Sequence, residues 1–348
     1  MKIKSLYFIL LSLLVSINAI SQNKERKFKI HTLAFYNLEN LFDTINDTNK
    51  NDEASPIMEI KYNRGKIYKK KISNMARVIS EIGYDVTNRP PTIIGICEVE
   101  NRKVVEDLIS DEKLKNYNYG IVHYESPDDR GIDVGLIFNK DIFKVKSSNS
   151  HDVFITGNNS SKRRNTRDQL VVSGLLDGDL IHIIVNHWPS RGADETKRIA
   201  AAEVNNSIID SLRNIHNNAK IITMGDFNDD PFDKSIKKVL GAKKEIKNVG
   251  KNDLYNPFEK ILVEQGIGTN AYRDKWQLFD QIILSRELLK KDYQDYQLYK
   301  AGVFNKSFLI NKKGKFKGYP YRSFSYGTFT EGYSDHLPPY IYLLKEIK

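Results

Sequence analysis

Cysteine is nearly absent from this sequence, since its 348 residues contain one, Cys97. A single chain therefore forms no internal disulfide, and the fold must be held by its core alone. Linkers rich in proline, glycine or serine are also lacking, and no internal repeat is found. These absences exclude a chain of several tethered modules, and they predict one domain over residues 22–348.

Long apolar runs are missing too, apart from one near the start. Residues 6–20 are apolar, follow Lys2 and Lys4, and are followed by Ser21. A positive start, a short apolar stretch and small residues near its end are typical of a secretory signal peptide, here residues 1–21. An uncleaved anchor is the less favoured alternative, because a membrane span needs ~20 apolar residues. We therefore predict a secreted or periplasmic protein without stable membrane insertion.

The charge balance is positive. Lysine and arginine number 54 and aspartate and glutamate 44, a net charge of +10, and loss of the two leader lysines leaves +8. A hydrophobic content of 40% excludes a largely disordered chain. A basic protein favours anionic partners such as nucleic acid or lipid headgroups, although charge says nothing about fold.

Short apolar runs, bounded by Gly, Pro, Asn or Asp, recur along the chain and predict β-strands. They are FKIHTLAFYN, PTIIGICEVE, DVGLIFN, LVVSGLL, LIHIIVNH, KIITMGDF, FDQIILS and LPPYIYLL. Helical periodicity between them predicts helices over 66–82 and 195–214 and a shorter helix after Asn101. Gly83 stands where a helix-ending glycine belongs. Residues 44–64 and 286–327 are predicted to be surface insertions in an α/β domain whose sheets are covered by helices.

Polar residues gather at the edges of the predicted strands. The set comprises Asn37, Glu98, His187, Asp226, Asn228, Asp280, Asp335 and His336. Strand ends at one rim of a sheet meet in space even when they are far apart in sequence. An oxygen-rich set of this kind suits a hard cation, Mg²⁺ or Mn²⁺, better than zinc. Histidines beside carboxylates can supply an acid or a base near neutral pH.

Seven motifs that contain these residues resemble the endonuclease/exonuclease/phosphatase superfamily in type and order. They are FYNLENLFD, ICEVEN, DRGIDVGLIF, VNHWPSRG, GDFNDDP, KWQLFDQIILS and YSDH, and they extend over nearly the whole mature chain. The resemblance implies a four-layer α/β/β/α sandwich of two packed mixed sheets, with the active site at one end of the sheets. It also implies a metal-dependent phosphodiester hydrolase.

The resemblance assigns a role to each candidate residue. Metal binding is expected of Glu98, Asn37 and Asp335, and orientation of the attacking water is expected of Asp226 and Asn228. His336 resembles the general base or phosphate-stabilising histidine, with Asp280 as the carboxylate that orients it. His187 matches a second histidine of the deoxyribonuclease-like and sphingomyelinase-like branches and argues against the apurinic endonucleases. Arg130 and Arg167 are candidate phosphate contacts, and Arg130 shares its segment with Asp133.

Other polar and aromatic residues have simpler interpretations. Glu39 is either a second metal ligand or a surface acid, and Asp229 and Asp230 are predicted to form a turn. The lysine-rich run 66–71 is predicted to be the solvated side of a helix. Structural roles are expected for His31 and His182, surface positions for His123, His151 and His216, and packing roles for Trp188 and Trp276.

The sequence carries fewer signals for the substrate than for the chemistry. We predict a monomeric, secreted endonuclease of low sequence specificity that acts on DNA, with RNA as a further substrate. The segment 312–329 interleaves Lys and Arg with Tyr and Phe, which is typical of nucleic-acid contact but also of an ordinary surface hairpin. A sphingomyelinase-like or inositol-phosphate phosphoesterase is the enzymatic alternative, and a non-catalytic binding protein on the same fold is another.

Overall fold

A computed structural model describes residues 26–156 and 162–347 of the chain. The predicted signal peptide, residues 1–21, lies outside the described residues. Among the helices of the described part, none is long and apolar enough to span a bilayer.

Two mixed β-sheets form the centre of the molecule. The six-stranded sheet has the order β16 (Gln297–Val303), β19 (Pro339–Ile347), β1 (Lys27–Leu41), β2 (Ile93–Val99), β4 (Asp133–Asn139) and β3 (Tyr119–His123). The seven-stranded sheet has the order β11 (Ala242–Lys243), β12 (Leu254–Tyr255), β15 (Asp280–Ser285), β10 (Ile221–Asp226), β9 (Asp179–His187), β8 (Gln169–Leu176) and β5 (Phe143–His151). Three two-stranded ribbons are added at the periphery: β6 (Ile155–Thr156) with β7 (Arg163–Arg164), β13 (Asn270–Tyr272) with β14 (Lys275–Gln277), and β17 (Phe324–Ser325) with β18 (Thr328–Phe329).

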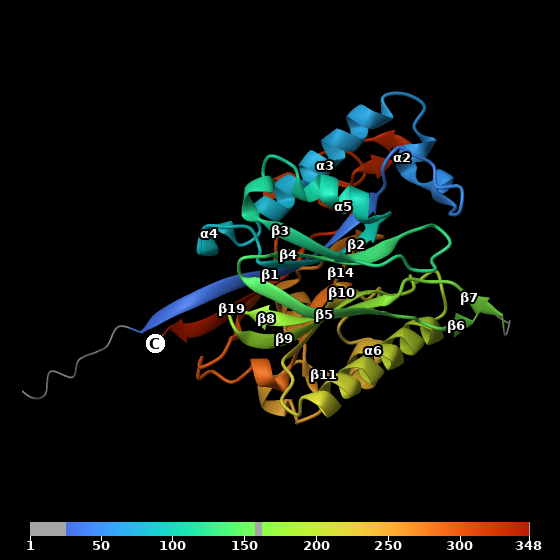
Figure 1. Cartoon of the computed structure of the whole chain (residues 1–348). Coiled ribbons are helices and arrows are strands. Elements are labelled where there is room, and N and C mark those ends of the chain that lie inside the picture. The colour runs from blue at the N-terminus through green and yellow to red at the C-terminus, as the bar shows by residue number, and fades with distance from the viewer. Residues whose placement is uncertain (1–25, 157–161, 348) are drawn as a thin grey trace, which may run out of the picture.

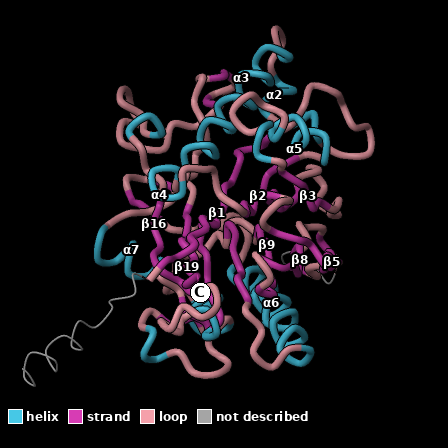
Figure 2. The backbone as a smooth tube through the Cα atoms, turned by 60° about the vertical axis from the view of Figure 1, so that its left-hand side comes forward, coloured by secondary structure: helices cyan, strands magenta, loops and turns pink. Residues whose placement is uncertain are grey.

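Helices cover the outer faces of the two sheets. They are α2 (Pro56–Glu59), α3 (Arg64–Glu81), α4 (Tyr84–Thr87), α5 (Arg102–Ile109), α6 (Glu195–Ile215) and α7 (Phe258–Gln265). Short helical turns occur at Asp52–Ala54, Lys115–Tyr117, Ser235–Val239, Ile246–Asn248, Arg286–Leu288 and Ser307–Leu309. Figure 1 shows α3 and α5 on one side of the paired sheets and α6 on the other. In Figure 2 the helices likewise lie outside the strands.

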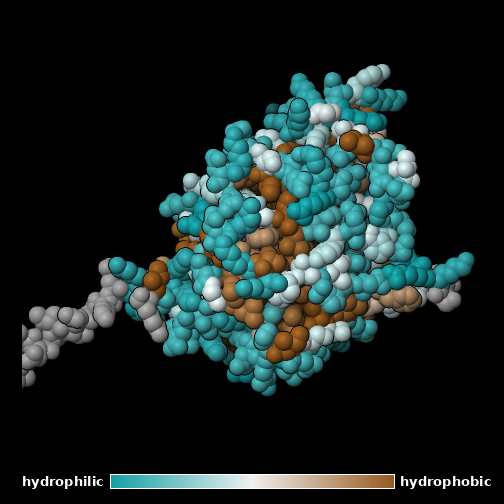
Figure 3. Space-filling model, viewed as in Figure 1, coloured by the Kyte–Doolittle hydropathy of each residue, from teal (hydrophilic) through white to brown (hydrophobic). Residues whose placement is uncertain are grey.

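The core follows the alternation of side chains along each strand. In β9, Ile183 and Val185 belong to the large cluster between the sheets, whereas Ile184 belongs to the cluster under α6. Successive strand residues point to opposite faces, so this strand is apolar on both. Apolar side chains gather over the strands in Figure 3, while hydrophilic residues cover the helical layers. The predicted four-layer α/β/β/α sandwich is therefore confirmed.

The predicted helices are present with nearly the expected bounds. The helix α3 ends before Gly83, whose φ of +70° is the left-handed conformation of a helix-ending glycine. At the start of α5 the side chain of Asn101 accepts a hydrogen bond from the backbone N–H of Val104. Asp194 caps α6 in the same way through the N–H of Thr196. Local capping chemistry thus fixes where these helices begin and end.

The surface-insertion prediction for 286–327 is wrong in part. Its middle forms β16, which pairs with β19 along the six-stranded sheet. This strand lacks a clear apolar run because β16 lies at the sheet edge, where Tyr299 and Lys300 are exposed, and an edge strand is half solvated. The other predicted insertion, 44–64, contributes Ile57 to a small apolar cluster with Phe42, Ile132 and Phe324.

The close packing of the two sheets predicts that Gly95 of β2 tolerates no larger side chain. A Cβ added there would lie 2.7 Å from Sδ of Met224 and 3.0 Å from Cδ2 of Phe35. We expect Gly95→Val to lower the free energy of unfolding by roughly 1–3 kcal/mol, as overpacked cores do. Urea denaturation measures this change. Gly65→Ala is the control, because no atom lies within 4 Å of its added Cβ and alanine favours the helix; an unchanged midpoint for Gly95→Val would contradict the tight packing.

Candidate active site

The strands place the predicted residues at one end of both sheets. In the seven-stranded sheet, Asp226 of β10 pairs with His187 of β9 on one side and with Asp280 of β15 on the other. In the facing sheet, Asn37 of β1 pairs with Cys97 of β2. The convergence of strand ends that the sequence predicts is thus a direct result of strand register.

Irregular backbone at the ends of β1 and β2 directs Glu98 into this site. The pairing of β1 with β2 shifts register between Asn37 and Leu41. Glu39, Asn40 and Glu98 there have φ values of 48°, 51° and 59°. Such left-handed conformations cost about 1–2 kcal/mol for residues other than glycine, and they cluster at functional sites. The result is that the N–H of Asn40 donates to Oε2 of Glu98 at 2.9 Å and fixes its carboxylate.

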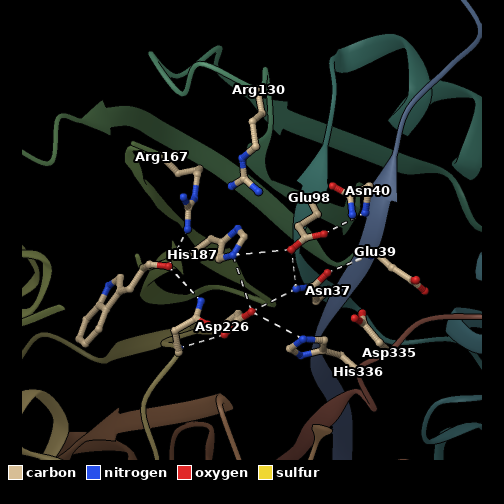
Figure 4. A network of polar contacts seen from close by, with 12 residues as sticks. Asn37, Glu39, Asn40, Glu98, Arg130, Arg167, His187, Asp226, Asp335 and His336 are labelled. Atoms are coloured by element: carbon tan, nitrogen blue, oxygen red, sulfur yellow. Dashed lines mark hydrogen bonds and ion pairs between the residues drawn. The ribbon is translucent and has the colours of Figure 1, made fainter. Parts of the chain in front are cut away.

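One amide group links the carboxylates of the two sheets. The Nδ2 of Asn37 donates to Oε1 of Glu98 at 3.3 Å and to Oδ2 of Asp226 at 3.1 Å, as Figure 4 shows. Its Oδ1 accepts a hydrogen bond from the N–H of Glu39 at 2.9 Å. In this arrangement Asn37 orients the carboxylates and presents no oxygen atom to a metal. The Nε2 of His187 lies 3.8 Å from Glu98 Oε1 and 3.7 Å from Asp226 Oδ2.

These oxygen atoms fit a hard divalent cation. Burial, followed by the charge of Asp280, raises the pKa of Asp226 from 3.8 to about 7. Two carboxylates that share one neighbouring amide in a buried site repel each other, and a bound cation removes that repulsion. Glu98 and Asp226 would therefore hold the metal, with Asn37 aligning them.

The histidine on the other side of Asp226 forms a pair with a second carboxylate. The Nδ1 of His336 lies 2.6 Å from Oδ2 of Asp280, and its Nε2 lies 3.9 Å from Oδ2 of Asp226. Burial opposes protonation of His336, but the charge and hydrogen bond of Asp280 outweigh it and raise the pKa well above its usual value. The imidazolium form suits this group to contact an anionic phosphate. Ser334 anchors the loop, because its Oγ donates to the backbone oxygen of Asn37 at 2.7 Å.

His187 is in the opposite protonation state. Burial, and then the positive charge of Arg167, lower the pKa of His187 well below its usual value. No described residue hydrogen bonds to its Nδ1. A neutral imidazole can donate one hydrogen bond and accept another, whereas the charged His336 can only donate.

The two candidate phosphate-binding arginines differ in exposure. Both line a cavity of about 480 Å³ that also contains Glu98, His187 and His336. Arg167 is buried, and its guanidinium donates to Oδ2 of Asp128 at 3.2 Å and to the backbone oxygen of Trp188 at 2.6 Å. The side chain of Arg130 is 52% exposed and lies 3.4 Å from Oδ1 of Asp128.

This exposure separates the roles of the two arginines. The half-exposed side chain of Arg130 is accessible from the cavity, whereas the buried Arg167 holds the cavity wall. Asn228 joins the same wall, because its Nδ2 donates to the backbone oxygen of Trp188 at 3.0 Å.

Asp335 and Glu39 share an arginine that the sequence did not single out. Arg322 donates to Oδ2 of Asp335 at 3.1 Å and to Oε1 of Glu39 at 3.2 Å. Glu39 is buried, and its Oε2 also accepts from the N–H of Ser323 at 2.6 Å. Its carboxylate is thus not on the surface, and it points away from the Glu98 cluster. Neither predicted role, surface acid or second metal ligand, agrees with this position, and Glu39 instead has a structural role. It fixes the segment before Asp335 to the end of β1.

Lys71 also helps to attach this segment to β1. Its position shows that the prediction of a solvated lysine run over 66–71 is wrong for this residue. Its side chain is fully buried rather than solvated, and its Nζ donates to the backbone oxygen of Glu39 at 2.6 Å and to Oγ of Ser323 at 2.8 Å. Burial lowers the pKa of Lys71 to about 8, and burial together with the charge of Asp335 raises that of Glu39 to about 7. The lysine run around Lys71 gives no signal of this role, because only its position on the inner face of α3 distinguishes it.

The remaining predictions are largely confirmed. His31 and His182 are buried and bonded to Asp177 and Ser173, and Trp188 packs edge-on against Phe227. His123 is an exception, because its side chain is 3% exposed and lies 3.0 Å from Asp133.

Asp229 and Asp230 do more than form a turn. Asp229 pairs with the buried Arg198 of α6 at 2.7 Å. Asp230 accepts a hydrogen bond from the N–H of Leu278 at 2.8 Å. The two residues thus fix the loop after β10 to its neighbours.

Comparison with known proteins agrees with this geometry. A model of the Endonuclease/Exonuclease/phosphatase family matches residues 32–345. An endonuclease/exonuclease/phosphatase family protein from Bacteroides thetaiotaomicron superposes with a TM-score of 0.56 at 16% identity, covering 93% of this chain and 98% of that chain. D. rerio TDP2 complexed with single strand DNA product gives 0.53 at 14% identity, covering 90% and 99%. A mannosyl-6-phosphatase of B. thetaiotaomicron VPI-5482 gives 0.53 at 16% identity, with the same coverage. No curated protein sequence matches significantly.

The chain belongs to the endonuclease/exonuclease/phosphatase family. Its members are metal-dependent phosphoesterases, so this protein is an enzyme of that class. The structural neighbours at this low identity show the shared fold and no particular substrate.

The raised pKa of Asp226 predicts that metal binding releases a proton near neutral pH. A carboxyl group with a pKa of about 7 is half protonated at pH 7, and the metal requires the ionised form. We expect the apparent affinity for Mg²⁺ or Mn²⁺ to weaken as the pH falls from 8 to 6. Calorimetric titration in two buffers of different ionisation enthalpy measures the released proton.

Glu100→Gln is the matched control for this measurement. Burial also raises the pKa of Glu100 to about 7, but its carboxylate accepts from the N–H of Asp43 and does not contact the cluster. This variant should keep the proton release. Affinity that does not change between pH 8 and pH 6 would contradict the role of Asp226 at the metal.

Proposed function

We propose that this protein is a secreted, divalent-metal-dependent endonuclease that hydrolyses DNA with little sequence specificity. One observation carries the proposal: cationic side chains border the acidic site on two sides. Arg130 and Arg164 line its cavity, and Arg273 and Lys315 line a neighbouring cleft. A phosphomonoesterase needs one phosphate pocket, whereas a polymeric phosphodiester extends past the reacting bond in both directions. Cations on both sides therefore favour a nucleic acid.

Each site residue then has a part in hydrolysis. Glu98 and Asp226 would hold a divalent metal, which when bound would supply positive charge to offset the negative charge that develops on a phosphate oxygen. Asp226 and Asn228 orient the attacking water at the end of β10. His336, kept protonated by Asp280, donates a hydrogen bond to the phosphate and stabilises its negative charge. Neutral His187 donates a hydrogen bond on the opposite side of Asp226.

Low sequence specificity follows from the kinds of group present. Arginine and lysine bind phosphates, which every nucleotide carries, and aromatic rings stack on any base. RNA offers the same features and is a further expected substrate. A lipid phosphodiesterase would instead need an exposed apolar loop for entering a membrane, and in the aromatic segment 312–329 five charged residues lie among the aromatic ones between 312 and 322.

A substrate panel tests this proposal directly. With Mg²⁺ or Mn²⁺ the mature protein should nick supercoiled plasmid DNA, and EDTA should stop the reaction. Glu98→Gln should lose roughly a hundredfold or more of the rate, because it removes a charge that binds metal. The same preparations are assayed on RNA, sphingomyelin, inositol phosphates and mannose 6-phosphate. Metal-dependent turnover of one of the last three without plasmid nicking would refute the nuclease, and no turnover at all would favour a binding protein.

Secretion is the second part of the proposal and rests on residues 1–21. After cleavage the chain should begin near Gln22 and be recovered from the periplasm or the medium. Intact-mass spectrometry of the protein from fractionated cells measures this. An intact chain from Met1 to Lys348 in the cytoplasm would contradict it.

A further inference from the structure

A cleft of about 1010 Å³ lies beside the metal-site cavity. One wall is the hairpin of β13 and β14, and the other is formed by residues 311–322. The cleft and the cavity share Gly192, and the cleft reaches Arg322 and Asp335. A substrate bound at the metal site therefore extends into this cleft without leaving the surface.

Each wall carries an aromatic ring with a cation beside it. On the hairpin, Tyr272 is 59% exposed and the guanidinium of Arg273 lies 5.2 Å from its ring centre. On the opposite wall, Nζ of Lys315 lies 5.8 Å from the ring centre of Phe316. Tyr272 is exposed and Phe316 is half-buried, and both rings line the cleft from opposite walls, an arrangement that suits a ligand with flat faces.

The acidic groups of the cleft already have partners. Asp274 accepts a hydrogen bond from Tyr319 at 2.7 Å, which ties the two walls together, and Asp335 is paired with Arg322. Arg273 and Lys315, by contrast, form no ion pair with any carboxylate in the described part of the chain. Two cations without an ion-pair partner, each beside a ring that lines the cleft, complement a ligand that alternates anionic groups with planar ones.

We propose that this cleft binds unpaired nucleotides of the substrate strand next to the reacting phosphate. Their bases stack on Tyr272 and Phe316, and their phosphates lie against Arg273 and Lys315. In a duplex the bases are stacked on each other and offer only their edges, so the rings select single-stranded or frayed DNA. The inference rests on the proposed nuclease function and adds to it a preference for unpaired strands.

Only one lysine of the segment 312–329 is placed to contact a ligand in the cleft. Of Lys312, Lys313, Lys315 and Lys317, only Lys315 lines the cleft. Phe316 lies against Tyr319, with ring centres 5.7 Å apart, and Tyr319 in turn bonds Asp274. This contact holds the Phe316 ring at the cleft wall. The other three lysines are exposed and contribute only to the general positive charge.

Binding measurements without metal test the inference apart from catalysis. Fluorescence anisotropy of the mature protein in EDTA compares a labelled ten-nucleotide oligo(dT) with a DNA hairpin of ten base pairs. The wild type should bind the single strand more tightly. Tyr272→Ala combined with Phe316→Ala should weaken that binding roughly tenfold or more, since each stacked base contributes measurably. Tyr299→Ala is the matched control, because Tyr299 is 58% exposed but lies on β16 outside the cleft.

The cations give a second, independent measurement. Arg273→Gln with Lys315→Gln should reduce the slope of log affinity against log salt by roughly 0.7 for each lost phosphate contact. Thermal unfolding checks that each variant is folded.

Failure of the inference and failure of the nuclease are distinguishable. Unchanged single-strand affinity in both double variants, or tighter binding of the hairpin by the wild type, overturns the inference even if plasmid is nicked. If the wild type binds neither oligonucleotide and nicks no plasmid, the nuclease function itself fails and the inference fails with it.

Discussion

The amide bridge between carboxylates of two different sheets is the constraint on which the site depends. Glu98 stands at the end of the six-stranded sheet and Asp226 at the end of the seven-stranded sheet, and one amide of Asn37 bonds to both. Neither carboxylate has a covalent or local reason to be near the other. Only the tight packing of the sheets, visible where Gly95 leaves room for Met224, brings them together. The core therefore determines the spacing of these two carboxylates as well as the stability of the fold.

The two histidines on either side of Asp226 differ in protonation because their surroundings shift their pKa values in opposite directions. Asp280 raises the pKa of His336, whereas burial and Arg167 lower that of His187. The loop that carries His336 is fixed in turn by Ser334 and, further back, by Glu39 and Lys71. These supporting residues are buried and hydrogen bonded, which holds the reacting groups in one geometry before substrate arrives.

Much of this could be predicted from sequence because strands have a simple signature. The runs that end in His187 and Asp226, and the run that begins with Asp280, place their polar residues in register as expected. The left-handed backbone at Glu39 and Glu98 could not be predicted, since neither residue type favours it.

The roles of residues that are fixed by tertiary contacts could not be predicted from the sequence either. Lys71 resembles its solvated neighbours in every sequence property and differs only in which face of α3 it occupies. Arg322 and Glu39 are linked by a contact between residues 283 positions apart, which no local pattern encodes. The predicted surface position of His123 is wrong for a similar reason: its side chain is buried by a tertiary contact with Asp133 on the adjacent strand β4.

The central claim is that Glu98 and Asp226, aligned by Asn37, form the primary metal site. Anomalous diffraction from crystals grown with Mn²⁺ measures this most directly. The account predicts a strong peak in the cavity lined by Glu98 and Asp226, as expected of a small divalent cation bound by carboxylates, and its loss in Glu98→Gln crystals. A peak that persists in Glu98→Gln, or that lies only beside His123 and Asp133, would contradict the account.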